Sequence, residues 1–463
     1  MIRTFRMFPL VAVLLVAVAA LPSLADEDSA KLKGLLPAYR GPGITGRPLS
    51  PGEARERGFN VHNMALQSWI TLPEFPGAPD FGSNVWGYTS PGGREYALMG
   101  LKNGVAFVDI TDPVNPVVVG HVAGNSSLWR DAKTIGQYAY IASEGGRGIQ
   151  VVDLRSIDAG VITHVKDKFS AGHSTTHTLI SNPASGYLYL CGANIGAGGL
   201  VAVSTADPVN PTVVGAWTSR YVHEAVVTTY DSGPFAGREI AYAFTGAYGV
   251  HVIDVTNKAA MTTIASITYP GVRFCHQGWL TQDKAYLYAD DEFDEIKSFD
   301  ETATHVFDVR NPAAPVYLGY FTNGWPSSDH NLYVHGTRVY ESNYRGGLHV
   351  FDCSDPAAPE HIAFFDTHPE SDNSGFNGSW GNYPFFASGS IAVSDMQRGL
   401  FILRLQPECR VDLNGDGEVN SLDFIAFLND FNDAGPNADW NADGSVNTLD
   451  VVAFLNDFDA GCS

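Results

Sequence analysis

The stretch that organises this 463-residue chain is Gly104-Val-Ala-Phe-Val-Asp109-Ile-Thr-Asp-Pro113-Val-Asn-Pro116-Val-Val-Val-Gly120. Its core, a short apolar run that usually ends in Asp, recurs six times further along the chain. The later copies begin at Gly148, Gly199, Gly249, Thr304, Gly347 and Gly399. Successive copies from Gly104 start 44, 51 and 50 residues apart. Periods of this length, with several strands in each unit, are typical of propeller blades. The seven copies therefore predict an all-β chain with seven blades.

Each unit contains four runs with the composition of strands, so we expect four-stranded blades. In the second unit these runs cover 129–135, 138–142, 149–154 and 161–166. The Asp at the end of the third strand can accept hydrogen bonds from backbone N–H groups two residues on. The final copy, 380–405, supplies only three strands, and the segment 64–72 precedes the first copy. We expect 64–72 to complete the last blade as its outer strand and so close the ring.

The two ends of the chain have different compositions. Arg3 and Arg6 precede an apolar run, and the small residues before Asp26 are typical of a signal-peptide cleavage site. Residues 1–25 are therefore predicted to be a secretory signal peptide. We expect an extended lead-in over 26–60, the propeller over 61–406 and a small α-helical module over 407–463. After signal cleavage no segment is expected to span a membrane. The net charge of −22 argues against nucleic acid as a partner.

The C-terminal module contains one twelve-residue loop twice, from Asp412 to Asp423 and from Asp439 to Asp450. Side-chain oxygens stand at loop positions 1, 3, 5 and 12, Gly stands at position 6, and position 7 of each loop offers its backbone carbonyl. This spacing surrounds one point with the hard oxygen ligands that Ca²⁺ takes. The sequence therefore predicts two Ca²⁺ ions. Their ligands are Asp412, Asn414, Asp416, Glu418 and Asp423 in the first loop, and Asp439, Asn441, Asp443, Ser445 and Asp450 in the second, where position 7 contributes its backbone carbonyl.

An apolar pattern at helical spacing follows each loop, as Phe424-Ile-Ala-Phe-Leu-Asn-Asp-Phe431 and Val451-Val-Ala-Phe-Leu-Asn-Asp-Phe458. This loop-then-helix duplicate resembles a dockerin type I domain. The resemblance implies docking to a cohesin-like or other surface protein through the residues before the last ligand of each loop. Those residues are Ser421, Leu422, Thr448 and Leu449. Cys409 and Cys462 bracket the module, and we expect a disulfide between them in an oxidising compartment.

The propeller repeat, apolar-Val-apolar-Val-Asp followed by Asn-Pro or Asp-Pro, resembles the LVIVD repeat of bacterial surface proteins. The whole chain resembles choice-of-anchor B family proteins, in which a propeller precedes an interchangeable attachment tail. The resemblance implies a secreted or cell-surface bacterial protein, and it carries no catalytic residues with it. Three further cysteines, Cys191, Cys275 and Cys353, are expected to be buried free thiols.

Candidate ligand residues occur where inner strands begin, which is where a propeller faces its central channel. His177, His223, His276 and His330 stand at the same phase of four consecutive blades, with Asp131 one blade earlier. Imidazoles that converge on a channel can bind a transition metal or an anionic ligand. The structural alternative is that duplication of the repeat copied one histidine that hydrogen-bonds to the neighbouring blade.

Acids near the ends of the second strands form a second set of candidates: Glu144, Asp290, Asp291, Glu292 and Asp395. We expect the densest part, the run from Asp290 to Glu295, to be a solvated loop, with a further calcium site as the alternative. Cys275 beside His276 has the composition of a nucleophile pair, although neighbours on a strand diverge. Trp86, Trp129, Tyr344 and Trp380 are candidates for stacking on sugar rings or for packing between blades.

Two functions fit these observations. The first is an exported binding propeller, without catalysis, that is tethered through a Ca²⁺-dependent module and takes an unknown ligand or glycan. The second is a glycan-active or metal-dependent hydrolase of a polysaccharide-degrading complex that uses the channel histidines. The sequence contains none of the GxSxG, HExxH or phosphate-loop motifs, which favours the first function.

Overall fold

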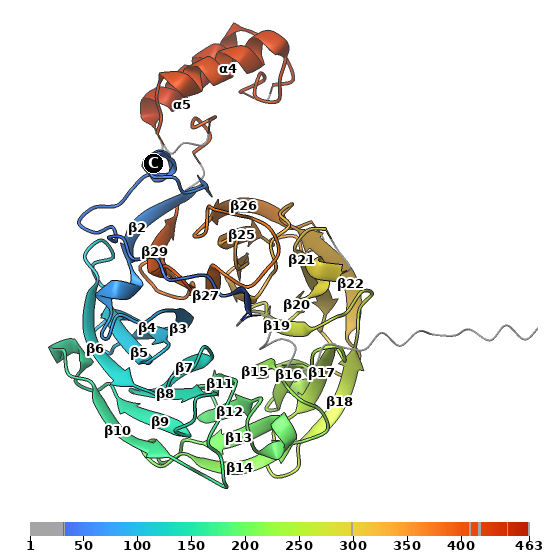
Figure 1. The fold of residues 1–463 in the computed structure, drawn as a ribbon. Helices are drawn as coiled ribbons and strands as arrows, with labels where there is room; N and C mark the ends of the chain where they lie inside the picture. Colours follow the sequence, from blue (N-terminus) through green and yellow to red (C-terminus); the bar gives the residue numbers. More distant parts are fainter. Residues whose placement is uncertain are drawn as a thin grey trace, which may run out of the picture.

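Seven β-sheets surround a central axis in the computed structural model, and two helices lie outside this ring (Figure 1). The structure describes residues 31–463 except 32, 298–299, 357, 407–408, 415–417, 442 and 462–463. The predicted signal peptide lies outside the described residues. The seven-bladed propeller predicted from the repeat is confirmed. No described helix has the length and apolar character that crossing a membrane requires.

The first three blades are regular antiparallel sheets with their strands in chain order. Blade 1 consists of β3 (Gly82–Thr89), β4 (Glu95–Leu101), β5 (Gly104–Asp109) and β6 (Val117–Ala123). Blade 2 consists of β7 (Arg130–Ile135), β8 (Tyr138–Ser143), β9 (Ile149–Asp153) and β10 (Thr163–Lys168). Blade 3 consists of β11 (Thr178–Asn182), β12 (Tyr187–Cys191), β13 (Leu200–Ser204) and β14 (Thr212–Trp217). The strands of blade 2 agree with the predicted ranges to within two residues.

Blades 4 to 6 repeat this pattern, and blade 6 gains a short fifth strand, β1 (Val61–His62). Blade 4 consists of β15 (Glu224–Thr229), β16 (Glu239–Phe244), β17 (Val250–Asp254) and β18 (Thr262–Ile267). Blade 5 consists of β19 (Cys275–Leu280), β20 (Tyr286–Asp291), β21 (Ala303–Asp308) and β22 (Val316–Thr322). Blade 6 consists of β23 (Asn331–His335), β24 (Arg338–Ser342), β25 (Leu348–Asp352) and β26 (Glu360–Phe365).

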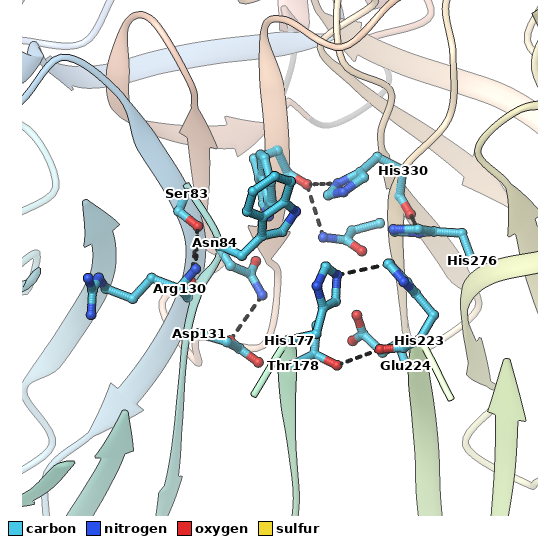
Figure 2. A pocket seen from close by; sticks show the side chains of 13 residues that line it. Ser83, Asn84, Arg130, Asp131, His177, Thr178, His223, Glu224, His276 and His330 are labelled. Carbon is cyan, nitrogen blue, oxygen red and sulfur yellow. Dashed lines mark hydrogen bonds between the residues drawn. The ribbon is translucent and has the colours of Figure 1, made fainter. Parts of the chain in front are cut away.

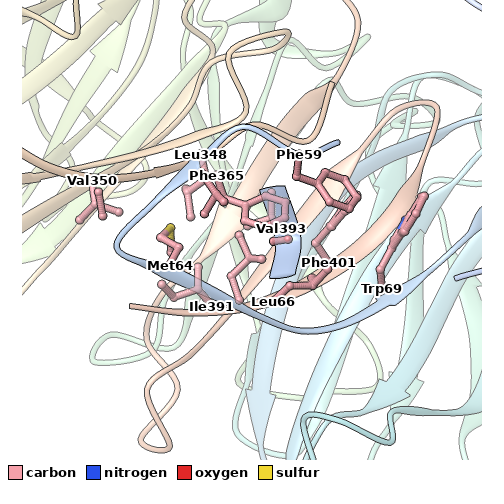
Figure 3. Packing of buried hydrophobic residues seen from close by; sticks show 14 of the residues in the cluster. Phe59, Met64, Leu66, Trp69, Leu348, Val350, Phe365, Ile391, Val393 and Phe401 are labelled. Carbon is pink, nitrogen blue, oxygen red and sulfur yellow. The ribbon is translucent and has the colours of Figure 1, made fainter. Parts of the chain in front are cut away.

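The last blade joins the two ends of the propeller. Its inner strands are β27 (Ser379–Tyr383), β28 (Ser390–Asp395) and β29 (Gly399–Leu405), and its outer strand is β2 (Met64–Ile70). The predicted closure by the early segment is therefore confirmed. Figure 3 shows Leu66 and Trp69 of β2 packed with Phe401 of β29 in a buried cluster that continues into blade 6. The indole of Trp69 stacks on Phe401, with ring centroids 5.1 Å apart.

The Asp at the end of the third strand forms the turn that the sequence predicts. Asp109 Oδ1 accepts a hydrogen bond from the Thr111 N–H at 3.0 Å, and Asp352 Oδ1 accepts one from Ser354 at 2.8 Å. The same bond is present at Asp153, Asp254 and Asp308. A carboxylate that satisfies the backbone of a tight turn explains why this residue type recurs at this position.

The lead-in and the connections between strands contain short helices, and two longer helices form the C-terminal module. The lead-in contains α2 (Pro51–Glu56), which has a capping box from Ser50 and Glu53. The insert between β20 and β21 contains α3 (Asp294–Lys297), and 3₁₀ turns cover Leu72–Glu74, Ile157–Ala159, Gly196–Gly198 and Gly233–Phe235. The module consists of α4 (Ser421–Asp433) and α5 (Thr448–Ala460).

The free cysteines follow the sequence-based expectation. Cys191, Cys275 and Cys353 are buried free thiols. Cys409 is disulfide-bonded, whereas its predicted partner Cys462 lies outside the described residues, so their pairing stays a prediction.

Candidate functional site: a histidine row in the channel and a duplicated helical module

Four histidines from blades 3 to 6 form a continuous row of rings in the centre of the propeller (Figure 2). The Nε2 atoms of His177 and His223 lie 3.1 Å apart. The ring centroids of His223 and His276 are 4.4 Å apart, and those of His276 and His330 are 4.5 Å apart. All four side chains are buried. The histidines converge because each stands at or just before the first residues of an inner strand, where the blades approach the axis.

The outer nitrogens of the row are held by neighbouring groups. His177 Nδ1 lies 2.6 Å from a carboxylate oxygen of Glu144. The carbonyl of His330 lies 2.6 Å from His276 Nδ1, and the carbonyl of Trp380 accepts from His330 Nδ1. A carbonyl can only accept, so these contacts place the proton on Nδ1 and leave Nε2 of His276 and His330 with a lone pair. The blade-to-blade bonds are those that the structural alternative predicts, and they orient the same rings for a ligand.

Glu292 completes a group with the ligand set of a metal site. Ligand atoms of His276, Glu292 and His330 all lie within 4.8 Å of one another, and the three residues are buried. Two imidazoles and a carboxylate suit divalent first-row transition metals. The Glu292 carboxylate also forms an ion pair with the buried ammonium group of Lys31 at 2.7 Å, and it accepts a hydrogen bond from the Tyr344 hydroxyl. The cation of Lys31 therefore sits beside the carboxylate that a metal would use.

Lys31 comes from the lead-in, whose described segment runs across the ring to its centre (Figure 1). Its Nζ is 5.3 Å from the centroid of the Trp380 ring, and its side chain is fully buried. The pocket beside the histidine row has a free volume of about 10 Å³. This is about the room that one water molecule needs, so the pocket has the size of a single ion or water and not of a sugar ring.

Burial sets the charge state of the row. Loss of hydration lowers the pKa of His223 and of His330 well below the ordinary histidine range, and neighbouring positive groups lower both further. These rings are therefore neutral, which is the state that binds metals and the state that binds anions least. The arrangement can hold a cation through nitrogen lone pairs, whereas the predicted alternative of an anion bound by protonated histidines loses support.

Asp131 lines the same pocket, but its oxygens are occupied by the protein. They accept from Lys133 Nζ at 2.8 Å, from Asn84 Nδ2 at 3.1 Å and from the Leu179 N–H at 2.9 Å. Asp131 thus joins blades 1, 2 and 3. Glu224 also lines the pocket, and burial raises its pKa to about 8.

The acidic run was expected to be a solvated loop, and this expectation is wrong. Its carboxyl groups are buried against the segment that leads into β19, from which the Arg273 and Phe274 N–H groups both donate to the Asp291 carboxylate at 2.6 Å. The buried acids are Asp290, Asp291, Glu292, Asp294 and Glu295. Glu292 was a candidate only within the second set of acids, and the structure places it with His276 and His330 of the channel. The signal for it was the dense acidic run directly after an inner-strand hairpin.

The other candidate residues of the propeller are packed in its interior and lack the chemical roles considered for them. Burial raises the pKa of the Cys275 thiol well above its ordinary value, so the Cys275–His276 pair lacks the thiolate that a nucleophile needs. Trp129, Tyr344 and Trp380 are buried in one cluster. Trp86 packs edge-on against Tyr383 at 5.1 Å. These rings therefore pack within the propeller.

The C-terminal module repeats one local structure. Asp423 Oδ1 accepts from the Asn414 N–H at 3.1 Å, and Asp450 Oδ1 accepts from the Asn441 N–H at 3.1 Å. The second carboxylate oxygen of each closes a capping box at the start of α4 or α5. These bonds draw the last residue of each loop back to position 3, as a loop that encircles an ion requires. Of the predicted ligands, Asp416 lies outside the described residues.

Four buried side chains form the core of the module: Val411, Phe427, Trp440 and Phe454. Phe427 and Phe454, at equivalent positions of α4 and α5, stack with centroids 4.2 Å apart. The predicted partner-binding residues are exposed, with Leu422 at 56% and Leu449 at 60%. Each begins an exposed apolar stripe, and the stripes have the same spacing, Leu422–Ile425–Leu428 on α4 and Leu449–Val452–Leu455 on α5.

Two segments match known families. Residues 410–457 match the dockerin type I domain, and residues 95–123 match the LVIVD repeat. The chain thus combines a β-propeller that contains an LVIVD repeat with a dockerin type I domain. No curated protein matches the chain.

Several solved structures resemble the fold at low identity. The β-propeller domain of Myceliophteria thermophila Cps50 (Swd1) has a TM-score of 0.48 and 13% identity, covering 70% of this chain and 98% of its own. A Lactobacillus plantarum protein has a TM-score of 0.47 and 14% identity, covering 63% and 85%. Kuenenia stuttgartiensis hydrazine synthase has a TM-score of 0.45 and 14% identity, covering 66% and 91%. TM-scores below 0.5 carry no argument about the function of this chain.

Proposed function

We propose that this protein is an exported bacterial binding protein whose propeller is attached to a surface or extracellular complex by its Ca²⁺-dependent C-terminal module. The observation that carries the proposal is the duplication of an exposed apolar stripe beside two loops with calcium-ligand spacing. Exposed leucines at 56% and 60% have no role within a fold whose core is formed by the opposite helix faces. A dockerin type I match over the same residues supports a cohesin-like partner.

The duplication leads to a sharp test, because each half presents the same docking residues. We expect Leu422→Asp alone and Leu449→Asp alone to retain binding to a cohesin-like partner, each through the other half. The double variant should lose binding, since both apolar stripes then carry a charge. Binding is measured by isothermal titration against a cohesin panel in Ca²⁺ and in EDTA. Leu318→Asp, on an outer strand of the propeller and 51% exposed, is the matched control.

Binding by the double variant equal to that of the parent would disprove docking through these stripes. Binding that persists in EDTA would disprove the calcium dependence while leaving the docking surface intact. The propeller is expected to retain its thermal transition in every variant, because the substituted residues of the module lie outside it and Leu318 is exposed.

The second candidate function is a metal-dependent hydrolase, and the His276, Glu292 and His330 group favours it. Co²⁺ is a suitable probe because its visible absorption reports the ligand set. A bound Co²⁺ that disappears in His276→Ala would support a metal centre in the channel. The free volume of about 10 Å³ and the buried Lys31 argue against a glycan substrate there, since the space beside the histidines has the size of one water molecule or ion.

A further inference from the structure

A second group of buried carboxylates lies beside the channel and combines two members of the acidic run with one residue of the next blade. Asp294 and Glu295 begin α3 in the insert of blade 5, and Asp329 lies just before β23 of blade 6. One ligand oxygen from each lies within 4.8 Å of the others. Their exposed fractions are 0%, 9% and 2%. Three acidic groups from two segments therefore converge in the interior.

The oxygens of this group have few partners in the protein. Both oxygens of Glu295, Asp294 Oδ1 and Asp329 Oδ1 are buried without a hydrogen-bond partner. Of the remaining two oxygens, Asp294 Oδ2 lies 3.3 Å from His305 Nε2, and Asp329 Oδ2 accepts from the Asp291 N–H at 3.4 Å. Within the described part of the chain, no Lys or Arg forms an ion pair with any of the three carboxyl groups. Buried polar atoms in proteins are almost always satisfied, so four orphan oxygens in one group point to a missing ligand.

The chemistry of the group identifies the class of ligand. It consists of carboxylate oxygens alone, which are the ligands of hard divalent cations. We propose that Asp294, Glu295 and Asp329 bind one Ca²⁺ ion that ties the insert of blade 5 to the start of blade 6. A carboxylate can be bidentate, so three carboxylates with added backbone carbonyls or water reach the six to eight oxygens that Ca²⁺ takes.

The position of the ion gives it a consequence for the channel. Glu292 precedes Asp294 by two residues, and His330 follows Asp329 directly. An ion that fixes Asp294 and Asp329 therefore fixes the backbone that presents Glu292 and His330 to the channel. Asp294, Glu295 and Asp329 are therefore positioning residues for Glu292 and His330. Residues behind the direct ligands orient those ligands in the same way at other binding sites.

The test compares the full-length parent with Glu295→Gln/Asp329→Asn. Both substitutions preserve shape and remove charge, so the double variant should fold without the ion. The matched control is Asp231→Asn/Glu360→Gln, which removes two exposed acids. Each EDTA-treated protein is dialysed to equilibrium against Ca²⁺, and bound calcium is counted by elemental analysis. Any calcium in the C-terminal loops is common to all three proteins, so the difference reports on the propeller alone.

We expect the parent and the control to bind one more Ca²⁺ per chain than the double variant. Equal counts would overturn the proposal and would mean that the three carboxyl groups share protons instead. A second measurement needs no variant: in the parent, Ca²⁺ should slow hydrogen exchange over residues 286–295 at least tenfold relative to EDTA. Unchanged exchange in that segment would also overturn it. If the loops of the C-terminal module bind no calcium, the difference in bound calcium between parent and double variant and the hydrogen exchange of residues 286–295 are both unaffected.

Discussion

Glu341 in β24 is one of the buried carboxyl groups that make the stability of the propeller depend on pH. Its partners are neutral: the Thr304 hydroxyl donates to Oε1 at 2.6 Å, and the Asn343 amide donates to Oε2 at 3.3 Å. Burial raises the pKa of Glu341 from 4.5 to about 7, and these two hydrogen bonds offset only part of the rise. The folded protein therefore binds this proton more tightly than the unfolded chain does.

The sign and size of the effect follow from linkage. A group with a raised pKa in the folded state contributes its full stability below pH 4.5 and loses it as the pH rises through about 7. The rise is worth about 3 kcal/mol in total at 1.36 kcal/mol per pKa unit, and about 2 to 3 kcal/mol of it falls between pH 5 and 8. Glu341→Gln has no proton to lose, so its free energy of unfolding should decrease by that much less over this range.

The assay is urea unfolding of the full chain, followed through the propeller transition by tryptophan fluorescence at pH 5, 6.5 and 8. Only the difference between parent and variant is used, because other buried acids titrate equally in both. Glu360→Gln, an exposed position on β26 of the same blade, should behave as the parent does. The reasoning is refuted if Glu341→Gln shows the same loss of stability from pH 5 to 8 as the parent.

Three further changes have defined outcomes. Phe454→Ala should unfold the C-terminal module and leave the propeller transition in place, because loss of a stacked core ring costs about 3 to 5 kcal/mol and the module has a small core. Far-UV circular dichroism should show the loss of helix, and an unchanged helix signal would contradict this prediction. Trp69→Ala should cost about 3 to 5 kcal/mol, because its indole stacks on Phe401 at the closure of the ring, and a thermal midpoint of the propeller transition within about 1 °C of the parent would count against it. Lys31→Met should raise the affinity of the channel for Co²⁺ about tenfold or more, because Glu292 then has no competing cation; equal affinity in a cobalt titration would show that Lys31 does not occupy the metal position.

Local chemistry that repeats along the chain can be read directly from the order of residues. The copies that start at Gly104, Gly148 and onward predict the number of blades, because each unit must bury its apolar strands against a neighbour. The Asp at each turn is predictable because its partner is only two residues away. The capping boxes at Asp423 and Asp450 are equally local. Such features depend on short-range geometry, which the amino-acid sequence specifies without reference to distant segments.

The histidine row was predictable in part. Aligned repeats placed His177, His223, His276 and His330 at one phase, and the structure brings them into one row of rings. The distances within the row and the neutral state of the rings required the structure, because burial depends on how closely seven blades approach the axis.

The sequence by itself determined the architecture of this protein: seven repeated blades, closure by an early strand, and a tail of two matching loop-helix units. Only the tertiary structure decided which polar residues meet in the interior. The run from Asp290 to Glu295 has the composition of a solvated loop, since charged runs usually face water. Its burial, and its meeting with Lys31 and Asp329, depend on contacts between segments up to hundreds of residues apart, and such contacts leave no periodic pattern in a single sequence.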